Sequence, residues 1–265
     1  MHLTADYHTH TPYSHGKNTV GENVARAKEL GLEQIAIADH GFAHIAYGIR
    51  RKQFDLYKAE CAAAEKEFGV KVLVGMEANI RSVFGETDMQ KSDYEDFDVF
   101  LCGNHIFIRY ATLGDWWKYG LGNIYARKII HHHSDKLIAR NTTAYIQTIK
   151  NNPLDILTHL NYLCPANALE VAKCAADYGT YIELNAKKLH LTDEELCEIV
   201  AKTSARFVIG SDAHSAVRVG ECSLVEQQLE RISFPMDRID NIEGRLPKFR
   251  FAQYKKGNYK PWRYR

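Results

Sequence analysis

The chain has 265 residues, of which 45% are hydrophobic and 25% charged, and its formal net charge is +1. These proportions are typical of a globular domain and exclude collagen-like, disordered and coiled-coil proteins. Its apolar runs are only strand-sized, so we expect no membrane span and no membrane partner. Because an acidic, histidine-rich segment follows Met1 in place of a secretory signal, the sequence predicts a cytoplasmic protein.

Strand and helix patterns alternate along the chain. We predict strands at 3–8, 33–39, 71–76, 98–103, 155–158, 181–184 and 206–210. Helices are predicted at 20–30, 51–68, 138–150, 166–178, 193–202 and 219–232. This alternation, with continuously apolar strands, indicates a parallel α/β architecture with both faces of the sheet covered. We expect one domain over 1–247, followed by a basic, aromatic tail over 248–265.

Histidine and acidic residues occur where the predicted strands end. The chain has 13 histidines. The side chains at strand ends that could bind a metal are His8, His10, His40, Glu77, His105, His159, Asp212 and His214. The C-terminal ends of all barrel strands share one face, and that face carries the active site. One histidine at a strand end is ordinarily just a polar loop residue, but so many together predict a metal centre. Imidazole and carboxylate ligands suit zinc, with manganese or iron as alternatives, and their number implies two or three ions.

These residues also stand in recognisable motifs. They are His8-Thr9-His10, His15, Ala38-Asp39-His40, Gly75-Met76-Glu77, Asn104-His105, Thr158-His159 and Ser211-Asp212-Ala213-His214. In this order they resemble the motifs of the PHP (polymerase and histidinol phosphatase) domain family, from residue 6 to about residue 220. The stretch 75–80 most resembles the YcdX-like bacterial phosphatases of that family. The resemblance implies a distorted (β/α)7, TIM-like barrel with three zinc ions at the C-terminal ends of its strands.

The resemblance also assigns ligands. It implies a first site of His8, His10, Glu77 and Asp212. It implies a second site of Glu77, His105 and His159, and a third of His15, His40 and His214. Among them, Glu77, Asp212 and His214 are the predicted catalytic residues.

The predicted reaction is hydrolysis of a phosphate ester on a small phosphorylated metabolite by a metal-bridging hydroxide. The chain has no GxSxG, GxxxxGK[ST] or GxGxxG motif that would support a competing chemistry. Arg81, Arg109 and Arg218 follow ligand motifs and are candidates for binding phosphate oxygens, the alternative being solvated surface charges.

Three other functions stay open at this point. They are a histidinol-phosphate phosphatase, a phosphodiesterase or exonuclease, and a non-catalytic metal-binding module. The tail has seven Lys or Arg and no acid, so the rest of the chain is mildly acidic, which argues against nucleic acid as a partner. A homo-oligomer is compatible with the sequence.

Several residues near the motifs have two interpretations. Asp6 and Asp39 are candidates for orienting ligand imidazoles, and Glu183 either does the same or pairs with Lys187. The histidines at 131–133 are predicted to begin a helix and to face solvent rather than form a fourth metal site.

Two aromatic segments also stay open. The segment 107–134 is longer than the loop expected there. Its aromatic residues form a lid, an interface or a small satellite core: Trp116, Trp117, Tyr119 and Tyr125. For the tail, docking on the body is favoured over binding of nucleic acid.

Overall fold

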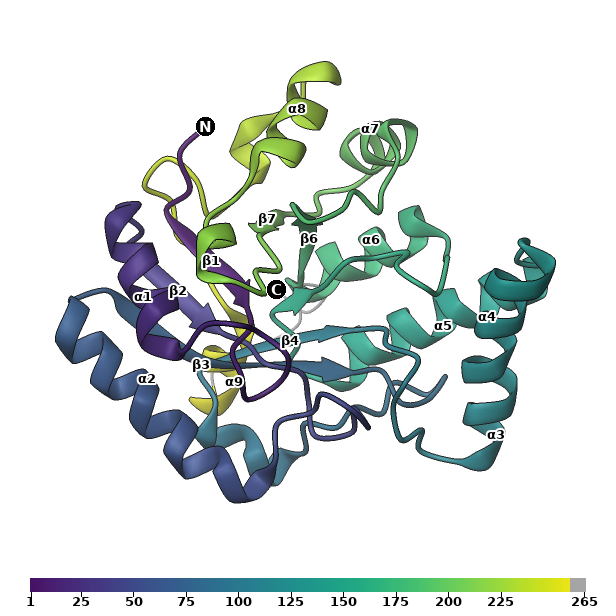
Figure 1. Cartoon of the computed structure of the whole chain (residues 1–265). Coiled ribbons are helices and arrows are strands. Elements are labelled where there is room, and N and C mark those ends of the chain that lie inside the picture. Colours follow the sequence, from purple (N-terminus) through teal and green to yellow (C-terminus); the bar gives the residue numbers. More distant parts are fainter. Residues whose placement is uncertain (258–265) are drawn as a thin grey trace.

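The computed structural model describes residues 1–257 of the chain. Its centre is a parallel sheet of seven strands in sequential order (Figure 1). The strands are β1 (Ala5–Thr9), β2 (Gln34–Ile37), β3 (Lys71–Asn79), β4 (Val99–Gly103), β5 (Ile156–Leu157), β6 (Tyr181–Asn185) and β7 (Phe207–Gly210). A parallel bridge between Thr9 and Ala213 brings the first and last strands together. The sheet therefore forms a nearly closed barrel, which confirms the predicted (β/α)7 fold.

Helices surround the barrel. They are α1 (Val20–Glu29), α2 (Phe54–Phe68), α3 (Leu113–Asp115), α4 (Gly122–Tyr125), α5 (Asp135–Asn151), α6 (Ala168–Tyr178), α7 (Asp193–Lys202), α8 (Ser223–Arg231) and α9 (Arg250–Lys255). A capping box between Thr19 and Glu22 begins α1. Gly69 ends α2 with φ 71°, a left-handed conformation that glycine adopts without steric cost. In the described residues, no helix has the length and apolar character needed to cross a membrane.

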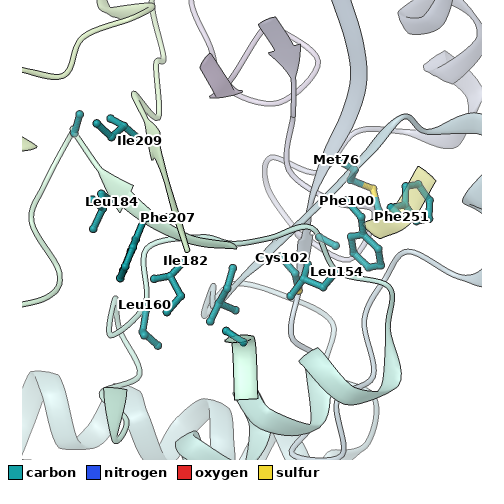
Figure 2. Close-up of a cluster of buried hydrophobic side chains, with 14 of the residues drawn as sticks. Met76, Phe100, Cys102, Leu154, Leu160, Ile182, Leu184, Phe207, Ile209 and Phe251 are labelled. Carbon is teal, nitrogen blue, oxygen red and sulfur yellow. The ribbon is translucent and has the colours of Figure 1, made fainter. Parts of the chain in front are cut away.

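Two buried layers sandwich the sheet. The outer layer lies between strands and helices and includes Phe100, Ile182, Phe207 and Phe251, which Figure 2 shows with their neighbours. The inner layer fills the lower barrel with Ala5, Tyr7, Ala36, Ala38, Val99, Leu101, Ile156, Tyr181 and Val208. Because successive residues of a strand face opposite sides, the same strands then present Glu77, Gly103, Glu183 and Gly210 to the upper barrel. The apolar inner layer thus supports a polar layer above it.

The chain returns after α8 to close the gap between β1 and β7. Ile239 bridges to Phe207 in β7, and Ile242 bridges to Leu3 beside β1. Asn241, fully buried between them, donates hydrogen bonds to Ala5 O (2.8 Å) and Ile209 O (2.7 Å) and accepts one from Ile209 N (2.9 Å). We call residues 239–242 the seam segment.

The described part of the tail packs against the barrel. Phe249 lies edge-on to Tyr7, with ring centroids 4.9 Å apart, and thereby covers the lower end of the inner layer. Phe251 in α9 is buried beside Phe100 (Figure 2). The Arg250 guanidinium is also buried and donates to Ile149 O (3.0 Å) and Tyr178 O (3.0 Å). The remainder of the predicted tail, 258–265, lies outside the described residues.

Some predicted boundaries are wrong. Strand β3 continues to Asn79 because its last residues pair with β4, so Glu77 lies within the strand and not at its end. Helix α8 begins at Ser223, after the short helix η5 (Ala216–Arg218). Helix α5 begins at Asp135, capped by Ser134, so the histidines at 131–133 precede the helix. The segment at 107–134 is not a loop, because α3, α4 and two π-helices, η3 (Trp116–Leu121) and η4 (Ala126–Ile130), occupy most of it. The other short helices are η1 (Arg51–Gln53), η2 (Lys91–Asp96) and η6 (Met236–Arg238).

Candidate metal centre

The upper barrel contains a cluster of histidines around one buried carboxylate. Glu77 Oε1 lies 2.6 Å from His159 Nε2 and 3.4 Å from His105 Nε2. Glu77 Oε2 lies 2.8 Å from His40 Nδ1, 3.4 Å from His8 Nε2 and 3.8 Å from His10 Nε2. Each of these side chains is provided by a different strand or the loop that follows it, His8 and His10 excepted, which share β1 and its end. The two oxygens of Glu77 therefore face different histidines.

A second carboxylate lies at the rim of the cluster. Asp212 Oδ1 is 3.4 Å from His10 Nε2 and 3.2 Å from His214 Nδ1. His15 stacks against this part of the cluster, with ring centroids 4.2 Å from His214 and 4.9 Å from His40. The nine side chains predicted as ligands thus meet in one place, and the predicted catalytic residues Glu77, Asp212 and His214 lie among them.

Two ligand positions have unusual backbone. His159 has φ 29° and Asp212 has φ 48°, both in the left-handed region that L-residues seldom adopt. Such a conformation costs on the order of 1–3 kcal/mol and persists where the surroundings impose it. At His159 the backbone N–H donates to Glu183 Oε2 (2.8 Å), which holds the strained residue in place. The directions of these two side chains are therefore maintained at a cost in the free energy of folding.

The donor atoms fit a set of metal ions. Four buried atoms face one another without forming a hydrogen bond of suitable geometry within the described residues: His8 Nε2, His10 Nε2, His40 Nδ1 and Glu77 Oε2. Such an arrangement is costly unless something else binds them. Three groups have donor atoms within 4.8 Å of one another: His8–His10–Glu77, His40–Glu77–His105 and His10–His40–His214. Each group shares two or more members with one of the three predicted sites. His40, which was predicted for the third site, also lies next to Glu77 of the first and second sites.

Electrostatics favour the protonation states that ligands need. Burial raises the pKa of Glu77, but the imidazoles of His105, His8 and His159 outweigh it and hold the pKa well below its usual value. Burial lowers the pKa of His10 to about 3. A metal ligand must be an ionised carboxylate or an imidazole with a free nitrogen, and these groups are already in that state near neutral pH.

Two histidines differ from His10. Burial lowers the pKa of His8 and of His159, but the carboxylates of Glu183 and Glu77 outweigh burial at both positions. The pKa of each imidazole is consequently raised, that of His8 well above its usual value. Binding a divalent ion at either side chain would displace this proton.

Polar side chains behind the cluster fix its orientation. Glu183 Oε1 lies 2.6 Å from His8 Nδ1, so the carboxylate holds this ring with Nε2 toward Glu77. Asn79 Oδ1 is 2.8 Å from His105 Nδ1 and acts in the same way. Asp39 accepts from Thr11 and lies 3.9 Å from His10 Nδ1, beyond hydrogen-bond distance, so the direct contacts are those of Glu183 and Asn79. Such partners set the tautomer and direction of a ligand imidazole.

Asp6 does not orient an imidazole, contrary to that interpretation of the sequence. Its carboxylate accepts from the backbone N–H of Gly220 (2.9 Å), Ser211 (3.2 Å) and His8 (3.3 Å). It therefore ties β1 to the loop after β7, because both segments donate to the same carboxylate. For Glu183, the structure shows the contact with His8; the ammonium of Lys187 lies against Asp212 instead.

Several residues at the site were not predicted. Asn79 and Asn185 each lie two residues beyond an inward acid, Glu77 and Glu183, so the strand period could have identified them. His44, whose ring stacks 4.9 Å from that of His40, and His190, 6.0 Å from His159, stand in loops where no period applies.

The three predicted phosphate-binding arginines lie near the rim, and each guanidinium donates a hydrogen bond to a backbone carbonyl. Arg81 Nε donates to Arg109 O (2.8 Å), and Arg109 Nη2 donates to Phe42 O (2.6 Å). Arg218 Nη2 donates to Ala186 O at 3.4 Å. These contacts join loops of the rim to one another.

The helical insertion reaches the neighbour of a candidate ligand through Tyr119. Tyr119 is buried and donates a hydrogen bond to Asn104, the neighbour of His105. Trp116 and Trp117 are 43% and 65% exposed and so contribute little to a satellite core. His131 and His132 are exposed as expected, whereas His133 is only partly exposed.

Comparisons with known proteins identify the family of this chain. The PHP domain family model matches residues 6–187. A probable phosphatase of Shewanella halifaxensis is 30% identical over 250 residues, covering 91% of this chain and 89% of the relative. A probable phosphatase of Caldanaerobacter subterraneus is also 30% identical, covering 91% and 88%.

A solved structure shows the same fold. Histidinol phosphate phosphatase from Lactococcus lactis, complexed with zinc, L-histidinol and phosphate, superimposes with a TM-score of 0.54 at 14% identity, covering 89% of this chain and 95% of that one. With a fold, a clustered donor set and two close relatives in agreement, the chain belongs to the PHP family and is a hydrolase that acts on phosphate esters.

Proposed function

We propose that this protein hydrolyses the phosphate monoester of a small metabolite at a centre of three divalent ions, with zinc preferred over manganese and iron. The observation that carries the proposal is the set of buried, unpaired donor atoms around Glu77. The number of ions is proposed from the three donor groups, which extend from His8 past Glu77 to His214. The zinc bound by the L. lactis phosphatase supports the preferred metal.

The residues have distinct roles in this proposal. Glu77 would bridge two ions with its two oxygens; Asp212, with His8 and His10, would hold one side of the centre, and His214 the outer side. When bound, the ions supply a water of lowered pKa and neutralise charge on the phosphoryl group. The chain contributes ligand geometry through Glu183 and Asn79, which keep the imidazoles directed at the centre.

The proposal is tested by loading the protein with zinc, manganese or iron and measuring metal content together with phosphate release. The substrate panel comprises sugar phosphates, nucleoside monophosphates, histidinol phosphate and p-nitrophenyl phosphate, with a dinucleotide as the diester. We expect about three equivalents of metal and hydrolysis of monoesters. Preferential cleavage of the dinucleotide would favour the phosphodiesterase alternative, and hydrolysis of histidinol phosphate alone would identify the histidine-biosynthesis alternative.

A further inference from the structure

Lys187 is held at the mouth of the metal centre by the network that orients its ligands. Asn185, the last residue of β6, accepts hydrogen bonds from the backbone N–H groups of Lys187 and Lys188, both at 3.1 Å. The Asn185 amide in turn donates to Glu183 Oε2 (3.0 Å). Because Glu183 also holds His8, the backbone of Lys187 is fixed relative to the ligands.

The ammonium group of Lys187 reaches the cluster. Its Nζ lies 3.3 Å from Asp212 Oδ1 and 3.1 Å from His214 Nδ1, while the side chain remains 45% exposed. Among residues 1–257, no other Lys or Arg nitrogen lies within 4.0 Å of a carboxylate oxygen of Glu77 or Asp212. Arg81 and Arg109, by contrast, place guanidinium nitrogens on backbone carbonyls.

We infer that Lys187 binds the phosphoryl oxygens of the substrate, an inference that rests on the proposed function. A divalent ion held by Asp212 and His214 would repel the ammonium from those two side chains. The side chain of Lys187 is exposed and flexible, whereas Asn185 holds its backbone in place. The ammonium group would therefore move away from Asp212 but stay at the mouth of the centre. A phosphate dianion bound at the ions would meet it there, and a lysine ammonium binds phosphate as a point charge.

The alternative is that Lys187 only balances the charge of Asp212. A purely charge-balancing lysine would leave phosphate binding unchanged once the metals are present. A phosphate-binding lysine would affect anion affinity without affecting the metals. The two roles therefore differ in a measurement that does not depend on turnover.

The experiment is isothermal titration of the zinc-loaded protein with inorganic phosphate, with metal content measured in parallel. Three variants are compared with the wild type: Lys187→Met, Lys187→Arg and the matched control Lys188→Met. The Lys188 side chain is also exposed but has no ion pair with Glu77 or Asp212 within the described residues. We expect Lys187→Met to weaken phosphate binding by about tenfold or more at unchanged metal content. Lys187→Arg should recover part of the loss, and Lys188→Met should bind as the wild type does.

The inference is overturned if Lys187→Met binds phosphate within about twofold of the wild type, if Lys188→Met weakens binding equally, or if Lys187→Met loses metal. Monoester hydrolysis is measured on the same samples. Lys187-dependent phosphate binding without hydrolysis of any ester would uphold the role of Lys187 while refuting the proposed function.

Discussion

Glu77 has both carboxylate oxygens turned toward candidate ligands, so we expect it to contribute to more than one metal site of the proposed centre. We predict that Glu77→Gln, which keeps the shape of the side chain, loses more than one equivalent of metal and nearly all activity. Elemental analysis of the purified variant measures the first effect, and phosphate release measures the second. His15→Ala serves as the comparison, because His15 lies at the outer side and should cost a single equivalent. Full metal occupancy in Glu77→Gln would contradict the bridging role.

Gly103 illustrates how a residue without chemistry can determine the site. A Cβ at this position would lie 2.2 Å from Thr158 Oγ1 and 2.5 Å from His159 Cε1. Gly103→Ala should therefore push His159 away from Glu77, lowering metal content and reducing kcat at least tenfold. Gly122→Ala is the control, since its Cβ would meet only Leu137 Cδ1 at 3.6 Å, an ordinary contact. A fully active, fully loaded Gly103→Ala protein would show that His159 is dispensable or can shift freely.

At the scale of elements, a buried acid adds to the contacts of Arg250 and Phe251 that attach α9 to the barrel. Asp155, which precedes β5, is fully buried and accepts from the backbone N–H of Phe100 (3.1 Å) and of Phe251 (2.8 Å). Burial raises the pKa of Asp155 to about 7, although these hydrogen bonds and Arg250 act to lower it. The folded protein therefore retains a proton that the unfolded chain releases near its ordinary pKa of 3.8.

The sign of the pH dependence follows from this difference. Since the folded state binds more protons between about pH 4 and pH 7, the free energy of unfolding falls as pH rises through that interval and levels off above it. Asp155→Asn should abolish this slope. Urea denaturation of both proteins at about pH 5 and pH 8 measures the effect, and the difference between them cancels the titration of the metal ligands. If the free energy of unfolding depends on pH equally in the two proteins, the proton retained on folding is bound by a group other than Asp155.

The helical insertion carries a prediction of its own. Trp116 and Trp117 are exposed, whereas Tyr119 in the same π-helix is buried against Asn104. Changing both tryptophans to alanine should leave the free energy of unfolding nearly unchanged while lowering kcat/KM for the physiological substrate. Hydrolysis of p-nitrophenyl phosphate, which is too small to need a lid, should be spared. Loss of stability, or an equal effect on both substrates, would instead indicate a structural role.

At the scale of the whole molecule, the barrel depends on its seam segment. Asn241→Ala removes hydrogen bonds to Ala5 and Ile209 from a fully buried position, and we expect unfolding to become easier by about 3 kcal/mol. His8 and Asp212 lie on opposite sides of this seam, so metal binding should also weaken. Chemical denaturation with and without zinc tests both effects. Asn151→Ala, which removes one exposed hydrogen bond, should change neither.

Much of the fold and the centre was predictable because it obeys short periods. Alternating strands and helices indicated the barrel, and residues such as His8 and Glu77 could be assigned to one face because parallel strands end together. Lys187 and His44 stand in loops, where the direction of a side chain depends on contacts with distant segments. Asn241 was unpredictable for the same reason: its role exists only once β1 and β7 have come together.

The split of the ligands across the seam has a consequence for the synthesis of the protein. A chain leaving the ribosome displays His8 and His10 early, whereas Asp212 and His214 emerge much later, and the seam segment later still. A fragment that stops before Asp212 contains His8, His10 and Glu77 but lacks Asp212 and His214, so the full donor set exists only after these later residues have been added. Until then the exposed histidines are available to whichever ion is abundant nearby. If the donor set holds metal as proposed, the supply of ions at the moment the barrel closes helps to determine which ion it takes.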